Sequence, residues 1–153
     1  MSLMERITGG SAVFGVVGLG YVGLPLAVEM AKAGHKVVGL DVSEGKTAEV
    51  NAGRSYIPDV PGDEFALLVT GGLIEATTDF SRANDCDCIA ICVPTPLDKM
   101  KEPDTSYMEA AARAIAPHLH DGVLVTLEST TYPGTTEEIV QPILEEGSGL
   151  RVG

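Results

Sequence analysis

The segment Gly18-Leu19-Gly20-Tyr21-Val22-Gly23 is the strongest indication of the fold of this 153-residue chain, because its spacing fits the pattern G-x-G-x-x-G. Gly18 permits a tight turn, Gly20 lets the backbone approach a pyrophosphate, and Gly23 lets a helix pack closely on the preceding strand. A helix N-terminus also offers unsatisfied N–H groups and a partial positive charge to a phosphate. The stretch therefore predicts a strand, a turn and a helix start that together hold a dinucleotide.

The charge-free segment from Ile7 to Val28 admits a second interpretation. Its 22 positions are long enough for a membrane span or for the core of a signal peptide. Six glycines and one proline lie inside it, however. In a helix interior each glycine costs about 1 kcal/mol and a proline about 3 kcal/mol relative to alanine. A buried strand followed by a tight turn and a helix start explains these glycines and the proline better than a membrane span does. We therefore expect no membrane partner.

Apolar runs alternate with amphipathic runs along the rest of the chain. Strands are predicted at Ala12–Val17, Lys36–Leu40, Ile74–Thr78, Cys88–Val93 and Val123–Leu127. Helices are predicted at Tyr21–Ala33, Ser43–Gly53, Asp63–Thr70, Thr105–His120 and Thr135–Leu144. Strands that are apolar throughout indicate a parallel sheet with both faces covered. The predicted fold class is therefore α/β, a doubly wound Rossmann-type parallel sheet with helices on both faces.

The chain has the length of one domain, for which about 100–200 residues are usual. We expect residues 1–11 to be an expression remnant, Met1-Ser2-Leu3, with a lead-in, and residues 12–153 to form the domain. The last residues, Leu150 to Gly153, resemble the opening of another strand. We therefore expect an N-terminal fragment of a longer protein.

The charge balance is strongly acidic. There are 22 acidic residues against 10 basic ones, for a formal net charge of −12 at pH 7. Such a field repels nucleic acid and anionic membrane surfaces, so we expect neither as a partner. A small anionic ligand is still compatible with it, because a local nest of backbone N–H groups can overcome a diffuse negative field.

The three cysteines form no disulfide framework, and the composition indicates a cytoplasmic protein. Cys88 and Cys92 share one face of a predicted buried strand, where we expect them to pack as small hydrophobic residues. His118 and His120 lie at a helix end with no organised set of thiols nearby. We therefore expect no metal site.

Asp41 ends the second predicted strand, 18 residues after Gly23. A carboxylate at this place accepts hydrogen bonds from the ribose hydroxyls of a dinucleotide and repels the 2′-phosphate of NADP, so NAD is favoured. Lys46 either lies over the adenine or reaches the ribose, or it is a solvated surface lysine.

Polar loops follow two further strands at the same predicted edge of the sheet. The predicted strand Cys88–Val93 ends in Val93-Pro94-Thr95-Pro96, and the predicted strand Val123–Leu127 is followed by Glu128-Ser129-Thr130. The two prolines fix the backbone around Thr95, whose hydroxyl could contact the nicotinamide ribose or a phosphate, and Ser129 and Thr130 could reach the nicotinamide end. The alternative is that these are only turn and cap residues. Thr135 is predicted to cap the last helix.

Four segments occur in order between residues 12 and 145: GLGYVGLPLA, the strand end at Asp41, VPTP followed by EPDTSYMEAAARAIAP, and LESTTYPGTTEEIV. Together they resemble the NAD-binding domain of the UDP-glucose/GDP-mannose dehydrogenase family. The pair VPTP and EST…PGTT is more specific than the glycine motif. Glu128 stands where the UDP-glucose enzymes tend to have lysine. This resembles the branch acting on UDP-N-acetylhexosamines such as UDP-N-acetyl-D-mannosamine.

The resemblance implies oxidation of a sugar C6 alcohol to a carboxylate, by two hydride transfers to NAD through a cysteine-bound intermediate. The positions that match cofactor contacts are Gly18, Leu19, Gly20, Tyr21, Val22, Gly23, Asp41, Val42, Lys46, Val93, Pro94, Thr95, Ser129 and Thr130. Thr130 also matches a threonine that helps to order the catalytic water, so it is the candidate catalytic residue. The family's nucleophilic cysteine, its lysine and its main glutamate lie in later segments, and Cys86, Cys88 and Cys92 match none of them. The implied substrate is a UDP-sugar in the full-length enzyme, for which we expect a homo-oligomer.

Two other classes share part of the pattern. NAD-dependent hydroxy-acid dehydrogenases share its first half but do not explain the VPTP and EST loops. A nucleotide-sensing regulatory domain, of the kind that gates potassium transport, would bind nucleotide without chemistry and would not need the loops of Thr95 and Thr130.

Overall fold

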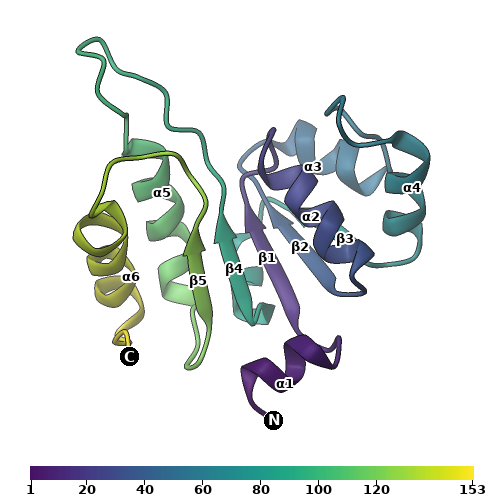
Figure 1. The fold of residues 1–153 in the computed structure, drawn as a ribbon, viewed down its shortest axis with the longest axis horizontal. Coiled ribbons are helices and arrows are strands. Elements are labelled where there is room, and N and C mark those ends of the chain that lie inside the picture. The colour runs from purple at the N-terminus through teal and green to yellow at the C-terminus, as the bar shows by residue number, and fades with distance from the viewer.

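The computed structural model describes residues 1–153, which form a five-stranded parallel sheet (Figure 1). The strands are β1 (Val13–Val17), β2 (Lys36–Leu40), β3 (Ile74–Thr77), β4 (Cys88–Ile91) and β5 (Leu124–Leu127). Their order in the sheet is β3-β2-β1-β4-β5, and every neighbouring pair is parallel. The chain starts in the middle and winds outward in both directions, which confirms the predicted doubly wound Rossmann-type fold.

Helices cover both faces of this sheet. The α-helices are α1 (Leu3–Thr8), α2 (Gly23–Lys32), α3 (Glu44–Asn51), α4 (Gly62–Thr70), α5 (Ser106–Ile115) and α6 (Gln141–Ser148). Buried side chains of α2, α3 and α4 share one core with the sheet, and those of α5 share the other. Successive strand residues alternate between the cores, since Val16 belongs to the first and Val17 to the second. None of these helices combines the length and the apolar composition that a membrane span requires.

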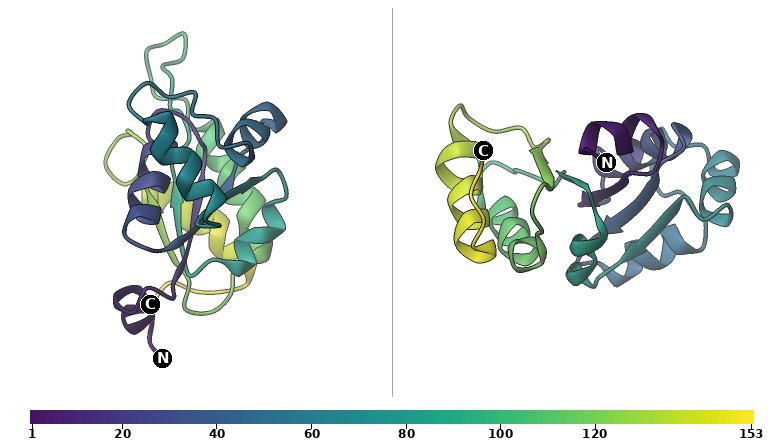
Figure 2. Two further views of the ribbon diagram at one scale, coloured as in Figure 1. Left: turned by 90° about the vertical axis from the view of Figure 1, so that its right-hand side faces the viewer. Right: turned by 90° about the horizontal axis from the view of Figure 1, so that it is seen from below.

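The carboxyl ends of β1, β2, β4 and β5 meet at one edge of the sheet. The register pairs Val17 with Leu40 and with Ile91, and Ile91 with Leu127. The segments that follow these four strands therefore leave the sheet side by side. Both termini lie at the opposite end of the molecule, while the loop between β4 and α5 projects beyond this edge (Figures 1 and 2).

Helix α1 lies where the sequence analysis predicted no element. Ser2 and Glu5 form a capping box, in which the Glu5 N–H donates to Ser2 Oγ at 3.2 Å and the Ser2 N–H donates to Glu5 Oε2 at 2.6 Å. The S-x-x-E pattern was a readable signal for this helix start. Arg6 then forms an ion pair with Asp87, just before β4, and so ties α1 to the sheet.

The helix predicted over Thr105–His120 is shorter in the structure. α5 ends at Ile115, and a 3₁₀ turn follows over Ala116–His118. Pro117 has no N–H to donate to the carbonyl four residues earlier, so the α-helix cannot continue through it. A second 3₁₀ helix, Phe80–Asp85, was not predicted at all.

The last helix differs from its prediction at both ends. A π-helical turn covers Thr136–Val140, and α6 continues to Ser148, where Gly149 closes it with φ +75°. Thr135 occupies the predicted N-cap position, but its side chain accepts no hydrogen bond from the helix. Its hydroxyl donates instead to the carbonyl of Tyr132 at 2.7 Å. A close approach explains the glycine inside α6, because a Cβ on Gly147 would lie 2.5 Å from the Cβ of Ala116.

Candidate functional site

The turn after β1 is built around Gly18. Its φ of +91° lies in the left-handed region, and a Cβ there would meet the Cys92 carbonyl oxygen at 2.7 Å. The Gly18 N–H donates to the Leu40 carbonyl at 2.8 Å. The tight turn that the motif predicted at Gly18 is present, and these contacts fix it between the ends of β2 and β4.

The other two motif glycines have different surroundings. A Cβ on Gly23 would lie 1.7 Å from the Gly18 carbonyl oxygen, so only glycine allows α2 to start this close to the turn. A Cβ on Gly20 would meet nothing within 4 Å. The space over Gly20 is therefore open to a ligand.

Four consecutive backbone N–H groups at the start of α2 donate to no protein acceptor, namely those of Gly20, Tyr21, Val22 and Gly23. The first helical hydrogen bond runs from the Leu24 N–H to the Gly20 carbonyl at 3.1 Å. No side chain caps the helix, and the Tyr21 and Val22 side chains are exposed. Free N–H groups at a helix N-terminus are the donors that bind phosphate.

Asp41 lies directly beside this turn and is only 8% exposed. Its Oδ2 accepts from the Leu19 N–H at 2.8 Å, and its Oδ1 accepts from the Ser43 N–H at 2.9 Å. An ionised carboxylate offers about four lone-pair positions, so it can still accept from two ribose hydroxyls. Asp41 is not the cap of α3, because that role falls to the Ser43 hydroxyl, which accepts from the Lys46 N–H at 3.2 Å.

Val42 and Lys46 complete this side of the site. The Val42 side chain is 85% exposed, and Lys46 is exposed on the first turn of α3. The Lys46 ammonium forms no ion pair. Both interpretations of Lys46, a ribose or adenine contact and a solvated lysine, therefore remain predictions.

The loops after β4 and β5 are joined by two hydrogen bonds. The Ser129 hydroxyl donates to the Val93 carbonyl at 2.8 Å, and the Thr95 hydroxyl donates to the Thr130 carbonyl at 2.5 Å. The structure thus brings the residues of both predicted loops together. It also gives the two hydroxyls a structural role, which leaves them as acceptors rather than donors to a ligand. The Thr130 hydroxyl, on an exposed residue, forms no hydrogen bond within the protein.

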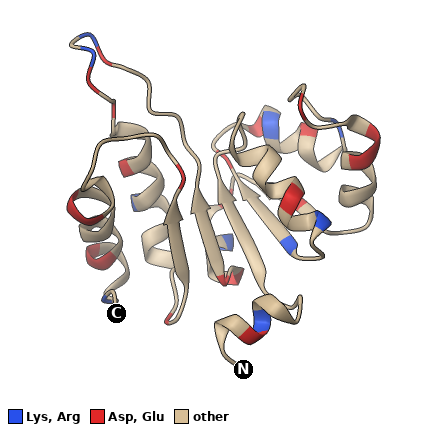
Figure 3. Ribbon diagram, viewed as in Figure 1, with Lys and Arg blue, Asp and Glu red and all other residues tan.

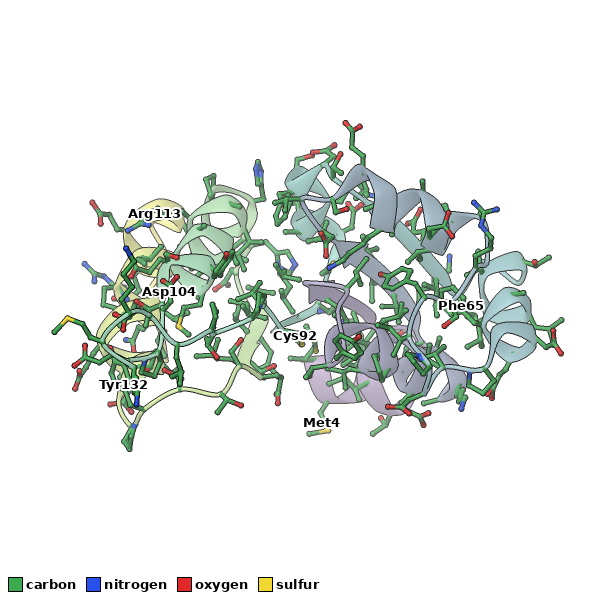
Figure 4. All side chains as sticks on the ribbon, turned by 90° about the horizontal axis from the view of Figure 1, so that it is seen from above. Met4, Phe65, Cys92, Asp104, Arg113 and Tyr132 are labelled. Atoms are coloured by element: carbon green, nitrogen blue, oxygen red, sulfur yellow. The ribbon has the colours of Figure 1, made fainter.

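Cys92 directly follows β4, near the middle of this edge (Figure 4). Figure 4 looks onto the edge and shows Cys92 between the part containing Phe65 and the part containing Asp104 and Tyr132. Burial, with the negative charge of Glu128, raises the pKa of the Cys92 thiol to about 11. A thiol with this pKa is a poor nucleophile at neutral pH, since the thiolate is the reactive form.

Tyr56, which sequence reasoning missed, also touches the turn. Its hydroxyl donates to the Leu19 carbonyl at 2.6 Å from the loop between α3 and α4. Burial first, and then the charge of Asp41, raises its pKa to about 12. The apolar pair Tyr56-Ile57 inside a proline-rich loop was the only sequence signal that this loop packs against the domain.

The residues present fit a dinucleotide. Free N–H groups, an open space over Gly20 and a buried carboxylate stand together at the carboxyl edge of a doubly wound sheet, where such folds bind nucleotides. The fold and the site therefore define a dinucleotide-binding Rossmann domain.

Residues 12–153 match the family described as the UDP-glucose/GDP-mannose dehydrogenase family, NAD binding domain. The chain belongs to this family and is an NAD-binding domain. This match assigns the chain to the UDP-glucose/GDP-mannose dehydrogenase family and not to the hydroxy-acid dehydrogenases or the regulatory nucleotide sensors.

Named relatives support this membership. The chain is 42% identical over 136 residues to UDP-N-acetyl-D-glucosamine 6-dehydrogenase of Pseudomonas aeruginosa, covering 89% of this chain and 31% of that protein. It is 40% identical over 136 residues to UDP-N-acetyl-D-mannosamine dehydrogenase of Escherichia coli K12, covering 88% and 31%. The crystal structure of NDP-N-acetyl-D-galactosaminuronic acid dehydrogenase from Methanosarcina mazei Go1 has a TM-score of 0.85 at 36% identity, covering 100% of this chain and 35% of that one. This chain spans about a third of the length of these relatives.

Proposed function

We propose that this chain is the NAD-binding part of an enzyme that oxidises the C6 alcohol of a UDP-sugar to a carboxylate with two NAD. Bound NAD would supply the hydride acceptor. The observation that carries the proposal is the set of four free N–H groups at Gly20 to Gly23, next to the buried carboxylate of Asp41. The family match and the names of the relatives support the sugar-nucleotide substrate.

Each part of the site has a proposed task. The turn Gly18–Gly23 holds the pyrophosphate, and Asp41 accepts the adenosine ribose hydroxyls, with Val42 and Lys46 beside them. Val93, Pro94, Thr95, Ser129 and Thr130 line the nicotinamide end. Because Thr95 and Ser129 donate to carbonyls, their oxygens can only accept from the cofactor. The free hydroxyl of Thr130 is the group proposed to help order a catalytic water.

We further propose that the substrate is a UDP-N-acetylhexosamine, as the relatives' names and Glu128 suggest. Residues 12–153 would be the N-terminal NAD-binding domain of a longer enzyme, with residues 1–11 as a lead-in. The relatives, about three times as long, support this division. The full-length enzyme would be a homo-oligomer in the cytoplasm, where three free cysteines are expected to stay reduced.

Calorimetry with NAD, NADP, ADP-ribose and ATP tests the cofactor assignment. NAD should bind more tightly than NADP, because Asp41 repels a 2′-phosphate, and ADP-ribose should retain most of the affinity. A preference for ATP over NAD would instead identify a nucleotide sensor and contradict the proposal.

A further inference from the structure

One side chain connects the loop after α3 to the nucleotide-binding turn. Tyr56 is partly buried against the first core, and its hydroxyl donates to the Leu19 carbonyl at 2.6 Å. The two residues are 37 positions apart in the sequence. The contact is therefore set by the tertiary fold and not by the turn itself.

The residue that Tyr56 contacts is held from three sides. The Leu19 N–H donates to Asp41 Oδ2 at 2.8 Å, and its carbonyl accepts from Tyr56. Its side chain is 1% exposed and packs beneath Gly39, where an added Cβ would lie 2.8 Å from Leu19 Cδ1. Leu19 is thus the anchor of the turn, and Tyr56 and Asp41 fix its two backbone polar groups.

This arrangement bears directly on the free N–H groups. If the hydrogen bonding of α2 began one residue earlier, the Leu19 carbonyl would accept from the N–H of Gly23, four residues later. It accepts from the Tyr56 hydroxyl instead, and the Gly23 N–H has no protein acceptor. A group that occupies the Leu19 carbonyl therefore helps to keep the first turn of α2 open to an anion.

We propose that Tyr56 is a positioning residue for NAD, which holds the Leu19 peptide so that the N–H groups of Gly20 to Gly23 face the pyrophosphate. The inference rests on the proposed NAD-binding function and goes beyond it, because Tyr56 lies outside the glycine motif and the strand-end loops. The raised pKa of Tyr56, about 12, keeps the hydroxyl protonated, so it donates throughout the pH range of ordinary binding experiments.

The test is Tyr56→Phe, which keeps the ring in the core and removes only the hydroxyl. Tyr107→Phe is the matched control, because Tyr107 is half-exposed on α5 and makes no hydrogen bond through its hydroxyl. Loss of one hydrogen bond predicts roughly 3- to 10-fold weaker binding of NAD and of ADP-ribose, which carries the same pyrophosphate. The control should bind both like the unmodified chain.

Hydrogen exchange measured by NMR separates positioning from general stability. In Tyr56→Phe the Leu19 amide should exchange faster, while the amides of the sheet strands, such as Val37 and Ile89, should keep their protection. Faster exchange throughout the domain would show a loss of fold and overturn the inference.

The outcomes also distinguish this inference from the proposed function. If the unmodified chain binds NAD and Tyr56→Phe binds it within about twofold, only the role of Tyr56 is wrong. If the unmodified chain does not bind NAD, the proposed function fails and this inference fails with it.

Discussion

The three glycines of the turn, Gly18, Gly20 and Gly23, are under different structural constraints. Gly18 needs a left-handed backbone and close contact with Cys92, and Gly23 needs room beside the Gly18 carbonyl. Gly20 has neither constraint within the protein. Its lack of a side chain matters only if a ligand occupies the space above it, so Gly20 and Gly23 make a matched pair of test positions.

We expect Gly20→Val to abolish NAD binding with little change in melting temperature, because the branched side chain would fill the pyrophosphate space. Gly23→Ala should instead destabilise the domain, by about 1–3 kcal/mol or more, because its Cβ would overlap the Gly18 carbonyl. Calorimetry with NAD and thermal melting of both variants measure the two effects. NAD affinity within about threefold of normal in Gly20→Val would mean that the pyrophosphate does not lie on this turn.

Asp41→Ala should weaken both NAD binding and folding, since the carboxylate accepts from two backbone N–H groups as well as from the proposed ribose. NAD affinity should fall roughly ten- to a hundredfold, and stability by about 1–3 kcal/mol. NADP should lose less affinity than NAD, because the repulsion of its 2′-phosphate disappears. Asp41→Asn keeps one acceptor oxygen and serves as a milder variant. An unchanged preference for NAD over NADP in a folded variant would remove Asp41 from the site.

The three cysteines should be unreactive in the folded protein. Burial raises the pKa of Cys86 to about 12 and that of Cys92 to about 11, and it raises the pKa of Cys88 as well. Near pH 8 their thiolate fractions are therefore small, and a thiol reagent also cannot reach them. Titration with a chromogenic disulfide should detect no thiol in the native chain and all three in denaturant. Rapid reaction of Cys92 in the native state would contradict its exclusion from nucleophilic chemistry.

At the scale of elements, the sequence predicted every strand and the type of each main helix, because apolar runs and glycine stops are local signals. The predicted helix ends were wrong for α5 and α6, where a single proline or glycine sets the end of the helix. Pro117 ended α5 early, while α6 continued to the left-handed cap at Gly149. Helix α1 was not predicted, because residues 1–11 were expected to be an expression remnant and a lead-in, although Ser2 and Glu5 marked its start.

Arg6 links α1 to the sheet, and its loss should destabilise the domain without affecting NAD. Asp87 is almost fully buried; its carboxylate forms an ion pair with Arg6 and accepts a hydrogen bond from the Val13 N–H. Arg6→Met therefore leaves this buried carboxylate without its charged partner. We expect a loss of about 1–3 kcal/mol in urea unfolding.

The control for Arg6→Met is Arg54→Met, which breaks an exposed pair with Glu49 and should cost about 0–1 kcal/mol. NAD affinity should be unchanged in both variants, because Asp87 lies at the amino edge of the sheet. Equal stability losses in the two variants would show that α1 is not anchored through Asp87.

At the scale of the whole molecule, the parallel topology explains why much of the candidate site could be predicted. All parallel strands end at one edge, so Asp41, Thr95 and Ser129 had to lie along the same edge of the sheet. The hydrogen-bond partners of the Thr95 and Ser129 hydroxyls could not be predicted. They depend on the relative path of two loops that are more than 30 residues apart in the sequence. Acidic residues are abundant on the outer helices (Figure 3), so the proposed binding of an anion at this edge relies on backbone N–H groups.

A domain that holds a cofactor but carries no reactive nucleophile should bind without turnover. We expect the 153-residue chain to bind NAD and to produce no NADH with UDP-N-acetylglucosamine or UDP-N-acetylmannosamine, because its only three cysteines are buried with raised pKa values. Gly20→Val, purified in the same way, is the control for contaminating enzyme. Equal NADH production in both preparations would come from a contaminant. Sustained production by the unmodified chain alone would place the complete catalytic machinery within residues 1–153, and the proposed dependence on a longer enzyme would be wrong.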